Sequence, residues 1–303
     1  MARIVKVAGA QLGGVQRAET REAVVARMLA LMDQAFERGC DLVVYPELAL
    51  TTFFPRYHVT TAEEIDPWFE TEMPNAVVQP LFDRARKYGI GFYLGYGEIA
   101  EDDSGKHRYN TSILVDKSGF IVGKYRKIHL PGHSGYESER DFQTLEKYYF
   151  SVGNLGFPVW NTMGGVMGMC ICNDRRWPET FRVMGLQGVE MVLLGFNTPT
   201  LNHKYFEPPH LRVFYSDLCV QAGAYQNSTW VVAVAKAGNE DGQHLMGASV
   251  IVAPTGQIVA RSYTDGDELI IAACDLDECR AGKENMFNFN AHRRPEHYRL
   301  LVE

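Results

Sequence analysis

The sequence predicts a single α/β domain with mixed sheets. Two observations carry this prediction. Buried strand patterns alternate with amphipathic helices, as in βαβ units, and two hairpin signals interrupt that alternation. Within the 303 residues no linker, low-complexity run or charge block marks a boundary, and 46% hydrophobic residues suffice for one sizeable core. We therefore expect one domain over residues 1–303.

The first half of the chain alternates strands and helices up to a hairpin. Strands are expected over 3–12, 41–45 and 90–99, separated by helices over 20–38 and 75–88. Each helix carries one apolar stripe, and Gly39 or Gly89 follows it as a C-terminal cap. The turn Asp116-Lys117-Ser118-Gly119 then joins strands over 111–115 and 120–125.

The second half resumes the alternation after an irregular segment. Residues 130–159 are polar and aromatic, and long irregular segments inside a compact domain are usually functional, so this one is expected to wall a pocket. The expected elements that follow are strands over 165–172, 189–195 and 229–237, helices over 178–187 and 208–226, a hairpin over 248–261, a strand over 268–274 and a helix over 275–282. The tail, about 283–303, is expected to pack on the domain or on a partner subunit.

Composition narrows the class of protein. The net charge of −7 argues against a nucleic-acid or membrane partner. Residues 1–7 enter a strand pattern directly and no apolar run could span a bilayer, so a soluble, cytoplasmic protein is expected. No metal-ligand spacing occurs, so neither metal nor cofactor is expected. Six cysteines are sparse for a chain of 303 residues, which favours reduced thiols over a disulfide framework. They are Cys40, Cys170, Cys172, Cys219, Cys274 and Cys279.

Three chemically active side chains stand at the ends of expected strands. Glu47 follows the strand over 41–45, Lys127 follows the first hairpin, and Cys172 ends the strand over 165–172. Loops at strand ends of α/β proteins expose side chains that the sheet holds in place, so Cys172 is a candidate nucleophile. Each residue also has an ordinary alternative: a core cysteine, a capping carboxylate and a surface lysine.

Together these residues resemble the Glu-Lys-Cys triad of the nitrilase superfamily of carbon–nitrogen hydrolases. The resemblance covers nearly the whole chain and lies in Pro46-Glu47-Leu48, the run 123–130 and the Cys172 turn. Longer stretches over 47–55, 127–132, 172–179 and 197–200 resemble the N-carbamoyl-D-amino-acid amidohydrolases, or D-carbamoylases. The resemblance implies a four-layer α-β-β-α sandwich that forms a homo-oligomer, a dimer or tetramer.

The same resemblance implies hydrolysis of N-carbamoyl-D-amino acids to a D-amino acid, ammonia and carbon dioxide through a carbamoyl-thioester. A urea-like group is a poor electrophile, so it requires a strong nucleophile, a proton shuttle and oxyanion stabilisation. Glu47 would take the proton of Cys172. Lys127 would favour the thiolate and, with the backbone N–H of Asn173, would stabilise the oxyanion.

Further residues are expected around the triad by resemblance. Glu146 matches a second glutamate that holds the lysine or the substrate in this family, and a surface position is its alternative. Asn197 and Thr198 match a substrate-contacting pair, and Asn173 is expected beside them. His129 is expected to support the site through a structural hydrogen bond.

Arg175 and Arg176 are the strongest signal of specificity. A guanidinium pairs with a carboxylate bidentately, and an N-carbamoyl amino acid carries a free carboxylate. Adjacent side chains usually point apart, so one of the two can serve the fold instead. Thr144 and Tyr215 stand where some D-carbamoylases carry histidines, which bears on side-chain preference and pocket shape.

Two other hypotheses remain open. The triad could act on N-carbamoyl-β-alanine, an amide or a nitrile, although the paired arginines argue against the last two. A protein of another class, a catalytically silent binding protein or scaffold on the same fold, has no need of Glu47, Lys127 and Cys172 together. A small-molecule substrate is the expected partner.

Overall fold

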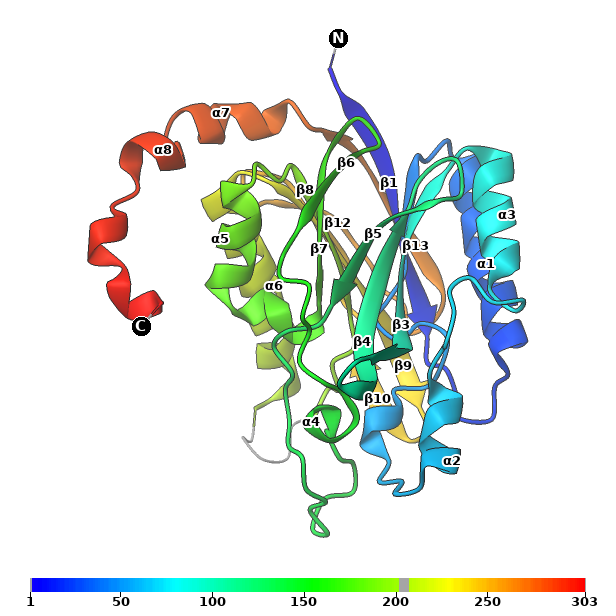
Figure 1. The fold of residues 1–303 in the computed structure, drawn as a ribbon. Coiled ribbons are helices and arrows are strands. Elements are labelled where there is room, and N and C mark those ends of the chain that lie inside the picture. The colour runs from blue at the N-terminus through cyan, green and yellow to red at the C-terminus, as the bar shows by residue number, and fades with distance from the viewer. Residues whose placement is uncertain (1, 202–206, 303) are drawn as a thin grey trace.

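In the computed structural model, which describes residues 2–201 and 207–302, two sheets pack face to face (Figure 1). One sheet contains β1 (Ile4–Gly13), β2 (Leu42–Val44), β3 (Gly91–Asp102), β4 (Gly105–Val115), β5 (Ile121–Arg126) and β13 (Glu268–Asp275). The other contains β6 (Val159–Thr162), β7 (Gly165–Ile171), β8 (Met191–Phe196), β9 (Trp230–Glu240), β11 (Val250–Val252) and β12 (Ile258–Arg261). The sheets join where Leu12 and Gly13 of β1 pair with Lys236 and Ala237 of β9.

Helices cover the outer face of each sheet. The helices α1 (Arg21–Glu37) and α3 (Gln79–Tyr88) lie on the first sheet, and α5 (Pro178–Leu186) and α6 (Pro209–Asn227) lie on the second (Figure 1). The predicted single-domain α-β-β-α sandwich is thereby confirmed. The chain forms these layers because its strands are apolar on both faces, as strands buried on both sides must be.

The first strand shows this double burial. Val5 and Val7 point into the core between the sheets, whereas Ala8 and Ala10 belong to the core beneath α1 and α3. Successive strand residues face opposite sides, so one apolar run supplies both layers. The parallel pairs β1–β2 and β2–β3 place the C-terminal end of β2, and the residues that follow it, at the edge where β7 and β8 also end.

Several boundaries differ from the sequence prediction. The helix expected over 75–88 begins at Gln79, because Asn75 Oδ1 accepts hydrogen bonds from Val77 N and Val78 N and forms a turn first. The strand expected over 165–172 ends at Ile171, and the helix expected over 275–282 is α7 (Glu278–Glu284). The four-residue strands β6 and β10 (Gln243–Met246) were not predicted; such short strands carry little alternation.

The irregular parts of residues 2–201 and 207–302 contain short helices. These are η1 (Phe54–Arg56), α2 (Ala62–Ile65), η2 (Asp66–Trp68), α4 (Glu146–Tyr149), η3 (Cys172–Arg176), α8 (Phe289–His292), η4 (Pro295–His297) and η5 (Arg299–Leu301). The tail extends from α7 past the outer side of α5 (Figure 1). Phe287 packs edge-on against Tyr225 of α6, and Arg182 of α5 lies over Phe289.

Candidate active site

The structure brings together the three residues of the predicted triad. Glu47 follows β2, Lys127 follows β5, and Cys172 begins η3 immediately after β7. Lys127 Nζ lies 2.7 Å from Glu47 Oε1 and 2.5 Å from Glu146 Oε2. Glu146 and the three triad residues are all buried. The site is therefore a cation between two carboxylates next to a thiol.

Two glycines fix the backbone of Glu47. A Cβ at Gly95 of β3 would lie 2.8 Å from Pro46 O, and one at Gly195 of β8 would lie 2.5 Å from Glu47 N. Both distances are too short for any other residue, so the chain at Pro46 and Glu47 passes between the two sheets in direct contact with each. The position of the carboxylate is therefore set by strand packing.

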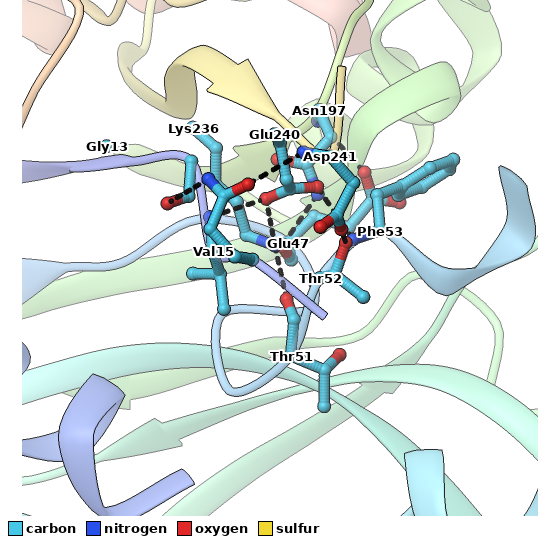
Figure 2. Close-up of polar contacts among 12 residues, drawn as sticks. Gly13, Val15, Glu47, Thr51, Thr52, Phe53, Asn197, Lys236, Glu240 and Asp241 are labelled. Carbon is cyan, nitrogen blue, oxygen red and sulfur yellow. Dashed lines mark hydrogen bonds and ion pairs between the residues drawn. The ribbon is translucent and has the colours of Figure 1, made fainter. Parts of the chain in front are cut away.

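The Glu47 carboxylate accepts hydrogen bonds at both oxygens. Besides Lys127, Oε1 accepts from Asn110 Nδ2 at 2.8 Å. Oε2 accepts from the backbone N–H of Asn197 at 3.0 Å, and Figure 2 shows Asn197 beside Glu47. Asn197 Nδ2 also donates to Glu47 O at 2.9 Å. Asn110 was not predicted: it is one of three consecutive buried polar residues of β4, with Thr111 and Ser112, and the sequence does not show which of them reaches Glu47.

Cys172 has a left-handed backbone, with φ of 47°, where β7 turns into η3. Its thiol lies 3.5 Å from Asn197 O. Burial raises the pKa of Cys172, and the negative charge of Glu47 adds to the shift. Lys127 and Arg175 oppose it without overcoming it. Lys127 thus favours the thiolate, as expected, but burial and Glu47 outweigh it, so the thiol keeps its proton in the resting protein and needs a base when it attacks.

Lys127 and Glu146 each influence the pKa of the other. Burial by itself would lower the pKa of Lys127. That pKa is nevertheless raised, because Cys172, Glu146 and Glu47 together favour the charged ammonium. Burial raises the pKa of Glu146 to about 7, although Lys127 opposes the shift. Lys127 therefore stays cationic, and Glu146 can hold a proton near neutral pH.

The two adjacent arginines point apart. Arg175 is buried, donates to Cys172 O at 2.7 Å and to Thr198 Oγ1 at 3.1 Å, and stacks on the ring of Phe196. Arg176 faces a cavity and donates to Asn173 Oδ1 at 3.2 Å. Repulsion from Arg175, followed by partial burial, lowers the pKa of Arg176 to about 10, so it remains a cation at neutral pH. Arg175 therefore braces the turn, and only Arg176 is presented to a ligand.

A cavity of about 390 Å³ opens above Cys172. Of the predicted site residues, those that line it are Glu146, Cys172, Asn173, Arg176, Asn197 and Thr198. Apolar walls come from Phe53, Phe142, Leu201 and Tyr215. The segment predicted to wall a pocket does so between residues 131 and 146, and Thr144 and Tyr215 both face the cavity.

Two other arginines of the cavity are paired with carboxylates. Arg140 forms an ion pair with Glu137, and Arg212 Nη1 lies 2.9 Å from Glu207 Oε2. Within residues 2–201 and 207–302, Arg176 has no carboxylate at ion-pair distance. Arg176 is therefore the cavity cation with an uncompensated charge in the described part of the chain.

His129 lies outside the cavity and ties two segments together. Its Nδ1 lies 2.8 Å from Asp174 Oδ1, and its ring stacks on Trp177 with centroids 4.9 Å apart. The buried Asp174 also accepts from Tyr125 OH at 2.7 Å and from Ile171 N at 3.0 Å. This hydrogen bonding fixes the chain after Lys127 against the Cys172 turn. Asp174 was not predicted, since a carboxylate in a polar motif gives no sign of burial.

A second cluster of buried charges stands beside Glu47 (Figure 2). Glu240 accepts from Phe53 N at 2.7 Å and from Val15 N at 2.8 Å. It also pairs with Arg56 at 2.5 Å and Lys236 at 3.2 Å. Glu240 thereby ties the segment that follows Glu47, including the cavity residue Phe53, to the end of β9.

Neither residues 2–201 nor residues 207–302 contain a group of three or more His, Cys, Asp or Glu side chains placed to hold a metal ion. Among the helices described, none has the length and apolarity needed to cross a membrane.

Comparison with known proteins identifies the family. The carbon-nitrogen hydrolase family matches residues 6–284, and the chain belongs to this family. It is similar to an N-carbamoylputrescine amidase of Solanum lycopersicum, with 27% identity over 99% of this chain and 95% of that one. It is also similar to a citrullinase of Francisella tularensis, with 30% identity over 92% of each chain. The chain is thus a cysteine-dependent hydrolase of non-peptide carbon–nitrogen bonds in the nitrilase superfamily.

Among solved structures, a carbon-nitrogen hydrolase from Helicobacter pylori has the same fold. The TM-score is 0.83 at 21% identity, over 100% of this chain and 99% of that one. The family match confirms the predicted superfamily, and the solved structure shows the same fold. These relatives bear names other than D-carbamoylase, so that finer likeness stays a proposal.

Proposed function

We propose that the protein hydrolyses N-carbamoyl amino acids that carry a free carboxylate. The observation that carries this proposal is Arg176, the cavity guanidinium without a carboxylate partner in the described chain. A substrate carboxylate would supply that partner while its carbamoyl group lies at Cys172. The relative named for N-carbamoylputrescine supports a carbamoyl substrate in this family.

In the first step Cys172 Sγ attacks the carbamoyl carbon and Glu47 takes the thiol proton. The developing oxyanion is stabilised by Lys127 Nζ and by the N–H of Asn173, which lies at the start of η3 where N–H groups have no intrahelical partner. Collapse breaks the bond to the terminal nitrogen. Glu47 returns its proton to that nitrogen, and ammonia leaves a carbamoyl-thioester on Cys172.

In the second step water attacks the thioester carbon. Glu47 accepts a proton from the water, and the carbon–sulfur bond breaks to restore the thiol. The product is an N-carboxylated amino acid, which loses carbon dioxide to give the free amino acid. Each proton taken by Glu47 is returned, and no redox change occurs.

Ammonia release from a panel of compounds tests the proposal. Matched N-carbamoyl-D- and L-amino acids, N-carbamoyl-β-alanine, an uncharged N-carbamoyl amine, an amide and a nitrile are compared. Replacing Arg176 with glutamine is expected to raise KM for carboxylate-bearing compounds about 10- to 100-fold, the worth of a charged hydrogen-bond pair. KM for an uncharged N-carbamoyl amine should not change. Arg38→Gln, at the exposed C-terminal end of α1, is the matched control. An equal effect on both kinds of compound would contradict the proposal.

We further propose a preference for the D enantiomer, which rests on the likeness of the motifs around Glu47, Lys127 and Cys172 to D-carbamoylases. Equal or faster turnover of the L compounds in the same panel would overturn this preference. The second candidate is a related amidohydrolase that acts on other carbamoyl compounds, amides or nitriles, and the names of the relatives favour it. Faster turnover of an uncharged carbamoyl amine would select that candidate.

A homo-oligomer is also proposed. Exposed apolar side chains gather on α6 and in the tail, where Phe214 and Leu218 are about half exposed and Leu300 and Val302 are 90% and 89% exposed. Burying such surfaces is favourable, so we expect the helical face and the tail of one copy to pack on another. Light scattering should give at least the mass of a dimer, and Leu218→Glu should lower it. A monomeric wild-type protein would contradict this.

A further inference from the structure

One oxygen of the Glu47 carboxylate is saturated and the other is not. A carboxylate oxygen accepts about two hydrogen bonds. Oε1 has two donors, Lys127 Nζ at 2.7 Å and Asn110 Nδ2 at 2.8 Å. Oε2 has one, the N–H of Asn197 at 3.0 Å. Only Oε2 therefore has an acceptor position left for a proton.

The open oxygen contacts a residue that also contacts the nucleophile. Asn197 donates its N–H to Oε2, and its carbonyl oxygen lies 3.5 Å from Cys172 Sγ. The base and the nucleophile thus meet at the same residue, which Figure 2 shows beside Glu47. Rotating the carboxylate to present Oε1 instead would break its bonds to both Asn110 and Lys127.

We propose that Asn110 is a positioning residue that reserves Oε2 of Glu47 for proton transfer. Its side chain holds Glu47, and its backbone carbonyl accepts the N–H of Lys127 at 2.8 Å, so one residue of β4 aligns two members of the triad. Only the NH₂ side of the amide can face Oε1, because a carboxylate oxygen donates nothing.

The second amide atom supports this role. Asn110 is 1% exposed, and its Oδ1 is buried without a hydrogen-bond partner in the described part of the chain. A buried unpaired acceptor is destabilising, and an apolar residue of similar size would avoid that cost. The fold thus retains a polar group here at a cost to stability, as expected where its NH₂ acts on the carboxylate.

Turnover of p-nitrophenyl acetate tests the proposal. Cys172 takes the acetyl group and releases p-nitrophenolate, and water activated by Glu47 then hydrolyses the thioester to acetate. This probe needs neither Arg176 nor a carbamoyl group, so the result is independent of the substrate proposed above. In Asn110→Leu we expect steady-state turnover to fall at least about tenfold and the acetylated protein to accumulate in the mass spectrum, because water activation by Glu47 becomes slower.

Replacing Asn110 with the ionisable residue aspartate distinguishes a role in positioning Glu47 from a role in the fold alone. In Asn110→Asp, burial and the adjacent Glu47 would raise the pKa of the new carboxyl, so at low pH it is protonated and can still donate to Oε1. The ionisable groups that surround Glu47 are Tyr93 on β3, Lys127 after β5, Glu146 on α4, Cys172 on η3 and Lys236 on β9. All five side chains are present in both the wild-type protein and the variant, so the carboxyl group at position 110 is the ionisable group that distinguishes the two.

The expected result is an Asn110→Asp variant that is closest to wild-type turnover near pH 5.5 and falls progressively behind as pH rises. Asn110→Leu should instead show the same deficit at every pH. The proposal is overturned if Asn110→Leu keeps wild-type turnover. It is equally overturned if both variants lose the same factor at every pH, since that result would leave Asn110 a structural role alone.

Discussion

Replacing Cys172 with alanine is expected to lower ammonia release by at least about 10⁴-fold, since no other group can form the covalent intermediate. The fold should survive, because alanine fills most of the space of a cysteine and meets the same backbone φ. The measurement is turnover of the best compound in the panel, together with the melting temperature.

Cys170 provides a matched control two residues earlier. It is a buried thiol of β7, the strand that leads into the Cys172 turn, and it does not line the cavity. Cys170→Ala should cost on the order of 1 kcal/mol of stability and leave turnover close to wild type. Equal loss of activity in the two variants would mean that Cys172 acts through packing and is not the nucleophile.

Replacing Lys127 with methionine is expected to remove activity and to destabilise the fold by about 3–5 kcal/mol, because Glu47 and Glu146 would remain buried without a cation. Urea unfolding measures the loss. The double variant Lys127→Met/Glu146→Gln should regain part of the stability and none of the activity, since it removes one of the two uncompensated carboxylates.

The destabilisation should depend on pH. Glu146 already has a pKa of about 7 because it is buried, and removing Lys127 would raise it further. A folded-state pKa above the unfolded value means that the folded protein binds the proton more tightly. The free energy of unfolding of Lys127→Met should therefore be greatest near pH 5 and fall as pH rises through 7. A loss independent of pH would show that the two carboxylates are not what destabilises the variant.

The sequence predicted the parts of the molecule that periodicity and chain order determine. Alternating strand and helix patterns give the layers, and strand ends place Glu47, Lys127 and Cys172 near one another because parallel strands end at one edge. The direction of neighbouring side chains within a short turn is decided by three-dimensional packing. Hence the sequence could say that Arg175 and Arg176 diverge, but not that Arg175 would be the buried one.

Contacts between distant segments could not be predicted for the same reason. Asn110 and Glu47 are 63 residues apart, and Glu240 and Phe53 are 187 apart. Nothing in the sequence around Asn110 or Glu240 indicates a partner, because a sequence does not show whether a polar residue is buried or exposed. The protonated state of Cys172 also depends on burial, which the sequence does not show.

The glycines at positions 95 and 195 bear on how such a protein can acquire new substrates. They seat Glu47 between two rigid sheets, whereas Phe142, Thr144 and Leu201 of the cavity wall stand on irregular segments. Insertions and replacements in such segments are tolerated far better than changes in strands. A mutant library confined to the wall should therefore yield altered selectivity with the bond-breaking machinery intact, and a library that includes Gly95 or Gly195 should yield mostly inactive protein.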